Sequence, residues 1–143
     1  MLHRKAIIFA IFMQLTSCAA SVSAIPDETT RGLLSVKMVN LSSAVNAYFS
    51  TLSVPPIPGS DGEILIEATK HDRRLLAPEF QPYTLKVQYQ NPYAVLLLCD
   101  KDNNQAIMED AGCSARLDRQ VRDNKPCDFT LQVKPGCQVE GAD

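Results

Sequence analysis

The chain has 143 residues, of which 45% are hydrophobic and 21% charged, with 14 basic and 16 acidic side chains. This length is typical of a single domain. An ordinary apolar content with only 9 prolines and 6 glycines excludes a collagen-like or wholly disordered chain. The net charge of −2 lacks the basic excess that is typical of nucleic-acid-binding proteins, so we expect no nucleic acid partner.

The N-terminal residues have the pattern of a secretory signal. A short positive start at Arg4 and Lys5 precedes an apolar run over residues 6–15. Signal peptides have apolar regions of about 7–15 residues, whereas a membrane-spanning helix needs about 20. We therefore expect this segment to direct export and then to be removed.

The end of the apolar run, LTSC at residues 15–18, resembles a bacterial lipobox. In that class of signal the cysteine, here Cys18, is lipidated and becomes the first residue of the mature protein. The resemblance covers residues 1–18 and no family is recognised for the rest of the chain. It implies a lipoprotein that is held in a membrane by acyl chains such as palmitate.

The lipobox resemblance also implies a location. An Ala at position 19, in place of the Asp that retains lipoproteins at the inner membrane, implies the periplasmic face of the cell outer membrane. The mature domain would then comprise residues 19–143. The alternative is ordinary cleavage after Ala24, which would remove residues 1–24 and give a soluble periplasmic or secreted protein.

Four cysteines remain in the exported chain by either route, and they are Cys99, Cys113, Cys127 and Cys137. An even number of cysteines in an oxidising compartment predicts two disulfide bonds, with three connectivities open. The chain has no CxxC motif, and the cysteines are ten or more residues apart. This spacing favours neither a redox pair nor a zinc site.

Residues 28–52 show the spacing of one long amphipathic helix. Asp27 can cap its start, and apolar residues recur at intervals of three and four along one side. These residues are Leu34, Met38, Leu41, Val45, Tyr48 and Leu52, and Leu33, Val36 and Ala44 widen the apolar stripe. We expect the helix to pack on a sheet.

Strand patterns follow the helix. The short apolar run 63–68, the alternating segment 83–89, the continuous apolar run 93–99, its return over 105–109 and the alternating segment 127–133 are all of strand length. The fold class is therefore α+β, with one helix on a mainly antiparallel sheet of about four strands and a disulfide-tethered C-terminal half.

The candidate partner-binding residues are Arg116, Arg119 and Arg122, which recur every three residues. On a helix they would form one basic stripe. Such a stripe would suit another envelope protein or an anionic envelope component such as lipopolysaccharide. We expect the protein to be a non-catalytic envelope lipoprotein acting as a binding, structural or assembly accessory module.

The alternative function is that of a small periplasmic enzyme using His71 with a carboxylate, either Glu67 or Glu79. No nucleophile elbow, zinc-protease motif or phosphate loop accompanies His71, so we expect no catalytic residues and no cofactor. Asp100, Asp102 and Asn104 have calcium-loop spacing. The remaining ligand positions of such a loop do not match, so we expect no metal site either.

Overall fold

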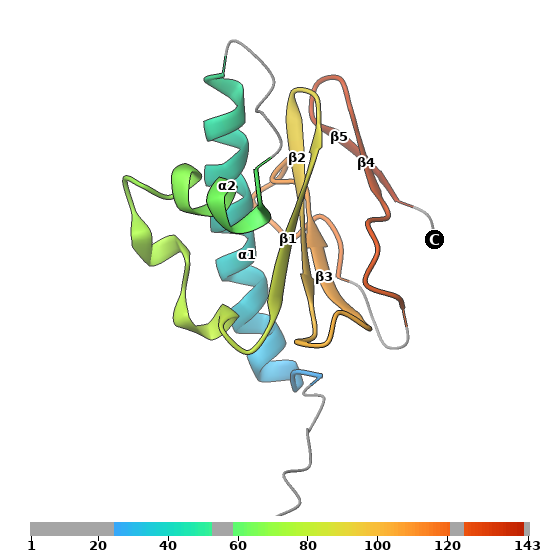
Figure 1. Ribbon diagram of the computed structural model, residues 1–143. Coiled ribbons are helices and arrows are strands. Elements are labelled where there is room, and N and C mark those ends of the chain that lie inside the picture. Colours follow the sequence, from blue (N-terminus) through green and yellow to red (C-terminus); the bar gives the residue numbers. More distant parts are fainter. Residues whose placement is uncertain (1–24, 53–58, 121–124, 142–143) are drawn as a thin grey trace, which may run out of the picture.

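The structure is a computed structural model that describes residues 25–52, 59–120 and 125–141 (Figure 1). The elements, in chain order, are α1 (Glu28–Ser50), α2 (Asp61–Ala68), the short 3₁₀ helices η1 (Arg73–Leu75) and η2 (Pro78–Phe80), β1 (Thr84–Gln90), β2 (Tyr93–Cys99), β3 (Ala106–Asp110), β4 (Leu131–Lys134) and β5 (Gln138–Gly141). One long helix with an antiparallel sheet of three strands and a second sheet of two strands confirms the α+β prediction. None of the helices in the described part of the chain is long and apolar enough to span a membrane.

The helix α1 forms where the apolar spacing predicts it. Asp27 caps its start by accepting a hydrogen bond from Thr30 N at 2.7 Å. One side of the helix is buried, and the residues on that side are Leu34, Met38, Leu41, Ser42, Val45 and Phe49. The prediction that Leu33 and Val36 extend the buried apolar side of the helix is wrong, because these side chains are 48% and 61% exposed.

The central sheet has the strand order β1-β2-β3, and both pairings are antiparallel. In the register, Val87 lies opposite Leu96, and Leu98 lies opposite Met108. Six of the seven residues of β2 are buried, as its continuous apolar run predicts for a central strand.

Both faces of this sheet are covered, which produces three layers (Figure 1). Leu96 and Leu98 belong to the core shared with α1 and α2. Leu97 packs instead with Cys127 and Phe129, on the side of the C-terminal segment. The C-terminal half of the chain therefore forms the third layer.

The prediction of a strand over 63–68 is wrong, because this run lies in α2. Ser60 Oγ accepts a hydrogen bond from Glu63 N at 3.3 Å, and Glu63 Oε2 accepts one from Ser60 N at 2.9 Å. This capping box satisfies two backbone donors at the start of a helix and favours the helical form. A short apolar run alone does not distinguish a strand from a buried helical turn.

The prediction of a last strand over 127–133 is only partly correct. The strand β4 begins at Leu131 and pairs with β5, which the alternation did not predict. Cys127 is buried, as expected, but it lies in the irregular segment that precedes the strand. Its position is fixed by a disulfide bond rather than by strand pairing.

Two disulfide bonds are present in the C-terminal half. Cys99, at the end of β2, is bonded to Cys127, and Cys113 is bonded to Cys137. The prediction that Cys99, Cys113, Cys127 and Cys137 form two disulfide bonds is confirmed. The first bond fastens the third layer to the central strand, and the second fastens the turn between β4 and β5 to the segment after β3.

Candidate functional site

The segment that carries the candidate arginines is an irregular loop over residues 111–120, not a helix. It follows β3 and runs back along the outer edge of that strand, where Glu109 N donates a hydrogen bond to Arg119 O at 3.2 Å. The single basic stripe that a helix would have produced is therefore absent from this loop. Arg122 lies outside the described residues.

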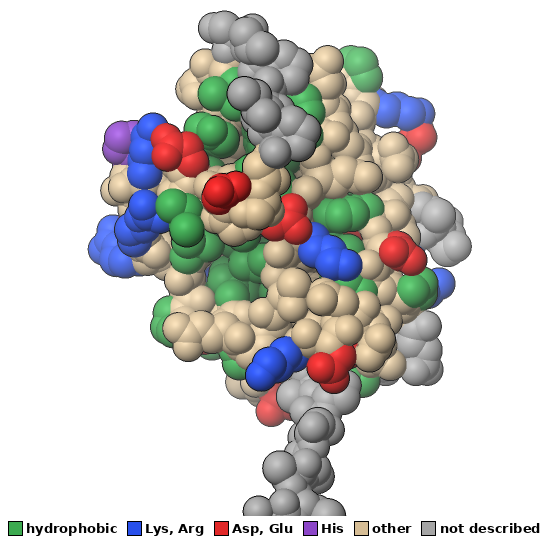
Figure 2. All heavy atoms as spheres, in the orientation of Figure 1, with side chains coloured by type: hydrophobic (Ala, Val, Ile, Leu, Met, Phe, Trp, Pro, Cys, Tyr) green, Lys and Arg blue, Asp and Glu red, His purple; other side chains and the backbone are tan. Residues whose placement is uncertain are grey.

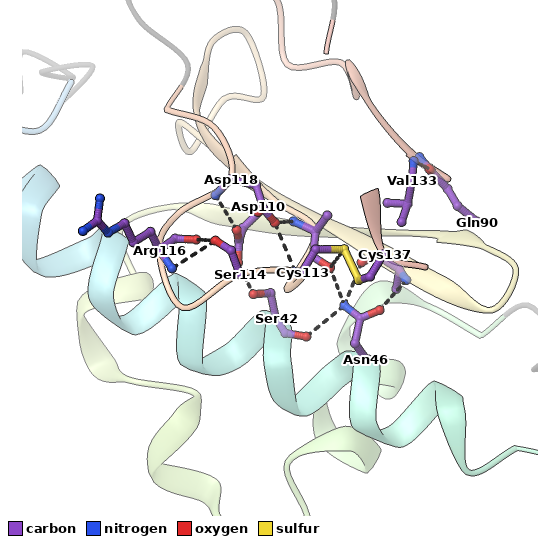
Figure 3. Close-up of a disulfide and its surroundings, with 12 residues drawn as sticks. Ser42, Asn46, Gln90, Asp110, Cys113, Ser114, Arg116, Asp118, Val133 and Cys137 are labelled. Carbon is purple, nitrogen blue, oxygen red and sulfur yellow. Dashed lines mark hydrogen bonds between the residues drawn. A yellow bond between two sulfur atoms is a disulfide. The ribbon is translucent and has the colours of Figure 1, made fainter. Parts of the chain in front are cut away.

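Buried and half-buried carboxylates hold this arginine loop (residues 111–120) in place (Figure 3). Asp118 Oδ2 accepts hydrogen bonds from Ala111 N at 2.9 Å and from Cys113 N at 3.3 Å. Asp110 Oδ1 accepts one from Asp118 N at 2.8 Å, and Asp110 Oδ2 accepts one from the hydroxyl of Ser42 on α1. Together with the disulfide at Cys113, these contacts give the loop a defined shape.

The environment of Asp110 changes its acidity. The pKa of Asp110 is raised from 3.8 to about 6, mainly because the carboxyl group is buried and in smaller part because the carboxyl group of Asp118 lies nearby. The hydrogen bonds from Ser42 and from the backbone of Asp118 lower this pKa but do not cancel the effect of burial. The side chain is fully buried, so its charged form at neutral pH lies out of contact with water.

The structure places the two described arginines differently. Arg116 is exposed, and Ser114 holds its backbone by donating to Arg116 O at 2.6 Å and accepting from Arg116 N at 3.1 Å. Arg119 is half-buried, and its guanidinium lies so close to Gly141 that a β-carbon there would collide with it. No ion pair among the described residues involves either arginine.

A shallow groove of about 280 Å³ separates the arginine loop from α1. It is lined by Ser35, Val36, Val39, Asn40, Ala115, Arg116 and Leu117. A wider hollow of about 620 Å³ lies at the start of α1, lined by Pro26, Asp27, Glu28, Arg31, Gly32, Ser35 and Gln120. Arg116 therefore stands at the border of a surface that runs along α1.

The second candidate region surrounds His71, in the turn that follows α2. A cavity of about 560 Å³ lies between α1 and α2, and its lining is Ala44, Ala47, Tyr48, Thr51, Leu52, Glu67, Ala68, Lys70, His71, Asp72 and Leu75. The walls from α1 are mostly apolar, and the charged side chains come from the end of α2 and the turn. Figure 2 shows basic and acidic side chains side by side around this end of α2.

The carboxylates near His71 are paired with other groups. Glu67 forms an ion pair with Lys70, and Asp72 pairs with Arg74 at 2.8 Å. Lys70 lowers the pKa of Glu67, and Arg74 lowers the pKa of Asp72. Glu79, the other expected partner of His71, pairs instead with Lys37 on α1 at 3.3 Å.

The three residues with calcium-loop spacing, Asp100, Asp102 and Asn104, lie in a turn between β2 and β3. Asp100 Oδ1 accepts hydrogen bonds from Asn104 N at 2.7 Å and from Gln105 N at 3.2 Å. This is the backbone contact for which turns favour Asp. Within the described ranges, no group of three or more His, Cys, Asp or Glu side chains is placed to hold a metal ion.

Sequence reasoning missed the polar residues that fix the arginine loop, which are Ser42, Asp110 and Asp118. One signal was available for Ser42, because it lies on the buried side of α1 between Leu41 and Val45. A polar residue at a buried helical position indicates a hydrogen-bonding partner. The partner itself, 68 residues away, had no sequence signal.

Comparisons with protein-family profiles, with curated proteins and with solved structures find no match to this chain.

Proposed function

We propose that this protein is a non-catalytic envelope lipoprotein, anchored through Cys18 at the periplasmic face of the outer membrane. Its folded domain acts as a binding or assembly accessory module. The partner is another envelope protein or an anionic envelope component, contacted through Arg116, Arg119 and Arg122. Cys18 and Arg122 lie outside the described residues, so the proposal draws on the sequence for both.

The observation that carries the proposal is the rigid presentation of Arg116. Its side chain is exposed, and its loop is held by the Cys113–Cys137 bond and by the carboxylates of Asp110 and Asp118. A guanidinium group binds carboxylate or phosphate with two parallel hydrogen bonds. Holding the loop in one shape reduces the entropy that is lost on binding.

The disulfide bonds support the assigned compartment. Such bonds form and persist in oxidising environments, including the bacterial periplasm. Both bonds lie in the half of the domain that carries the arginines. An exported binding module of this size benefits from such crosslinks, because its single core is small.

The test is capture from solubilised envelope membranes, with the intact protein as bait and purified lipopolysaccharide as a separate probe. Replacing Arg116, Arg119 and Arg122 with Ser should reduce capture of the specific partner at least tenfold. Arg73, an exposed arginine on η1, gives the matched control, and Arg73→Ser should bind like the unaltered protein. Unchanged binding by the triple variant would refute the proposed surface.

The cavity beside His71 favours one alternative, a small periplasmic enzyme that uses His71 with Glu67. Its volume of about 560 Å³ is in the range of small-molecule sites, and both side chains line it. A panel of chromogenic ester and glycoside substrates provides the test. Turnover that His71→Ala abolishes, while Arg73→Ser leaves it unchanged, would favour this alternative over the binding module.

A further inference from the structure

The outward side of α1, all of which the structure describes, is almost free of charge. Its exposed residues are Glu28, Thr29, Gly32, Leu33, Val36, Asn40, Ser43, Ala47 and Ser50, and only Glu28, at the helix start, is charged. A helix on the surface of a globular protein normally carries charged and polar residues on the side that faces water. We call the eight uncharged residues the outer face of α1.

Large apolar side chains are exposed on this outer face. Leu33 is 48% exposed and Val36 is 61% exposed, and they are two of the four large hydrophobic residues that are exposed in the described part of the chain. Both lie in the N-terminal half of α1, one turn apart. In the C-terminal half, the outer face consists of small or short side chains, at Ser43, Ala47 and Ser50.

We propose that the outer faces of α1 from two copies of this chain pack antiparallel and form a homodimer. A two-fold axis near Val39 and Asn40 would bring Val36 of one copy opposite Ser43 of the other, and Leu33 opposite Ala47. Each large side chain would thus meet a small one, which is how facing helices interlock. One patch that contacts itself is also the usual geometry of a dimer interface.

The distribution of charge selects the antiparallel arrangement. The charged residues of α1 are Glu28, Arg31 and Lys37, and no residue from Met38 to the helix end is charged. Antiparallel packing places each charged half against the uncharged half of the other copy. Parallel packing would bring Glu28 of each copy to the same end of the interface and would align the two helix dipoles.

The polar groups on the outer face favour a second protein helix over a lipid surface. The amide of Asn40 and the hydroxyls of Ser43 and Ser50 would lose hydrogen bonds in hydrocarbon. In the antiparallel arrangement Asn40 would lie beside Asn40 of the second copy and Ser50 opposite Thr29, so these groups can donate and accept across the interface. Arg116 lines the same groove as Val36, Val39 and Asn40, so the proposed two-fold axis lies beside the arginine loop.

Single cysteine substitutions in the full chain, expressed in cells that export it, test the arrangement. Asn40 lies beside the expected axis, so Asn40→Cys should give a disulfide-linked species of twice the monomer mass on a non-reducing gel. Ser50 would lie about 31 Å along the helix axis from its own counterpart. A disulfide needs Cα atoms within about 7 Å, so Ser50→Cys should stay monomeric.

The crosslinking results distinguish the antiparallel dimer from a parallel dimer and from a protein that does not form a homodimer. Crosslinking of Ser50→Cys as well would indicate parallel packing and overturn the antiparallel dimer. An Asn40→Cys protein that stays monomeric, or that crosslinks to a protein of another mass, would overturn the homodimer itself.

A second measurement avoids new cysteines. Ala47→Glu puts a charge opposite Leu33 in the proposed contact, at an exposed helical position where Glu is well tolerated. Sedimentation of the naturally processed protein should show a dimer for the unaltered chain. Ala47→Glu should weaken dimerisation at least tenfold, and Gln81→Glu, an exposed control on another surface, should leave it unchanged. A monomeric unaltered protein at about 100 μM would refute the proposal without bearing on the arginine loop or on Cys18.

Discussion

The hydroxyl group of Ser42, in the middle of α1, donates a hydrogen bond to the buried carboxylate of Asp110 at the end of β3. One turn further along α1, Asn46 donates to the backbone oxygens of Ala94 and Ala111, both at 2.9 Å. It also accepts a hydrogen bond from Ala94 N at 2.9 Å. These contacts fix α1 against the sheet and against the beginning of the arginine loop.

The first prediction concerns the dependence of stability on pH. Because folding raises the pKa of Asp110 to about 6, the folded state holds this proton more tightly than the unfolded state. The stabilisation is complete below the unfolded pKa of about 4 and is lost as the pH rises through about 6. Asp110→Asn keeps the shape of the side chain and cannot ionise. We expect it to raise the unfolding free energy at pH 7.5, relative to the unaltered protein, by up to about 2–3 kcal/mol.

Denaturant titrations of both proteins at pH 5 and at pH 7.5 measure this difference. The exposed residue Asp128 supplies a control, and Asp128→Asn should follow the unaltered protein at both values. If the unfolding free energy of Asp110→Asn changes between pH 5 and pH 7.5 by as much as that of the unaltered protein, protonation of Asp110 does not cause the pH dependence.

The second prediction concerns three glycines in different surroundings. Gly112 has a φ of 65°, and a β-carbon there would lie 2.9 Å from the backbone oxygen of Ser42. Gly136 has a φ of 79° with open space around it, and Gly32 lies in α1 with open space around it. We expect Gly112→Ala to lower the unfolding free energy most, by about 3 kcal/mol or more. Gly136→Ala should lower it by about 1–2 kcal/mol, and Gly32→Ala should raise it by up to about 1 kcal/mol.

Thermal denaturation of the three variants checks this order. A Gly112→Ala protein as stable as Gly136→Ala would mean that the arginine loop can move away from α1 without lowering the unfolding free energy. The order of the first two variants therefore measures how firmly the arginine loop is held.

Local patterns predicted the elements whose burial repeats regularly. The spacing of Leu34, Met38 and Leu41 located α1, and the continuous apolar run of β2 identified the central strand. The run 63–68 was misassigned because three consecutive apolar residues fit a strand and a buried turn equally well. The capping box formed by Ser60 and Glu63 indicates a helix at this position.

The arrangement around the arginines could not be derived from spacing. A period of three suggested a helix for 116–122, yet Arg119 pairs with Glu109 on the edge of β3 and the carboxylate of Asp110 accepts a hydrogen bond from Asp118 N. These are tertiary contacts, and they override local propensity. The exposure of Leu33 and Val36 could not be predicted either, because the number of apolar residues on a helix does not show how much of the helix the sheet covers.

The third prediction concerns the disulfide bonds. Each closes a loop, with sequence separations of 28 and 24 residues, and loops of this size are stabilised by about 3–4 kcal/mol when they are crosslinked. Replacing both cysteines of one pair with Ala should lower the unfolding free energy by this amount. The effect should be larger for Cys99 and Cys127, because both are buried and their truncation also leaves a cavity.

Alkylation of the unfolded, unreduced protein followed by mass spectrometry checks the pairing directly. None of the four cysteines from Cys99 onward should be labelled. Labelling of any two of them would contradict the pairing, and equal stability losses for the two double variants would contradict the expected contribution of the buried cavity.

The last prediction concerns the anchor. If Cys18 is lipidated, the unaltered protein should remain with the membrane fraction, and Cys18→Ser should move to the soluble periplasmic fraction without the acyl mass. A single acyl chain binds a membrane only marginally, so a stable anchor requires the two or more chains that a lipobox cysteine receives. Ser17→Ala keeps a small residue before the cysteine and should behave like the unaltered protein. Cleavage after Ala24 predicts a different result, because the unaltered protein would then be soluble and Cys18→Ser would change nothing.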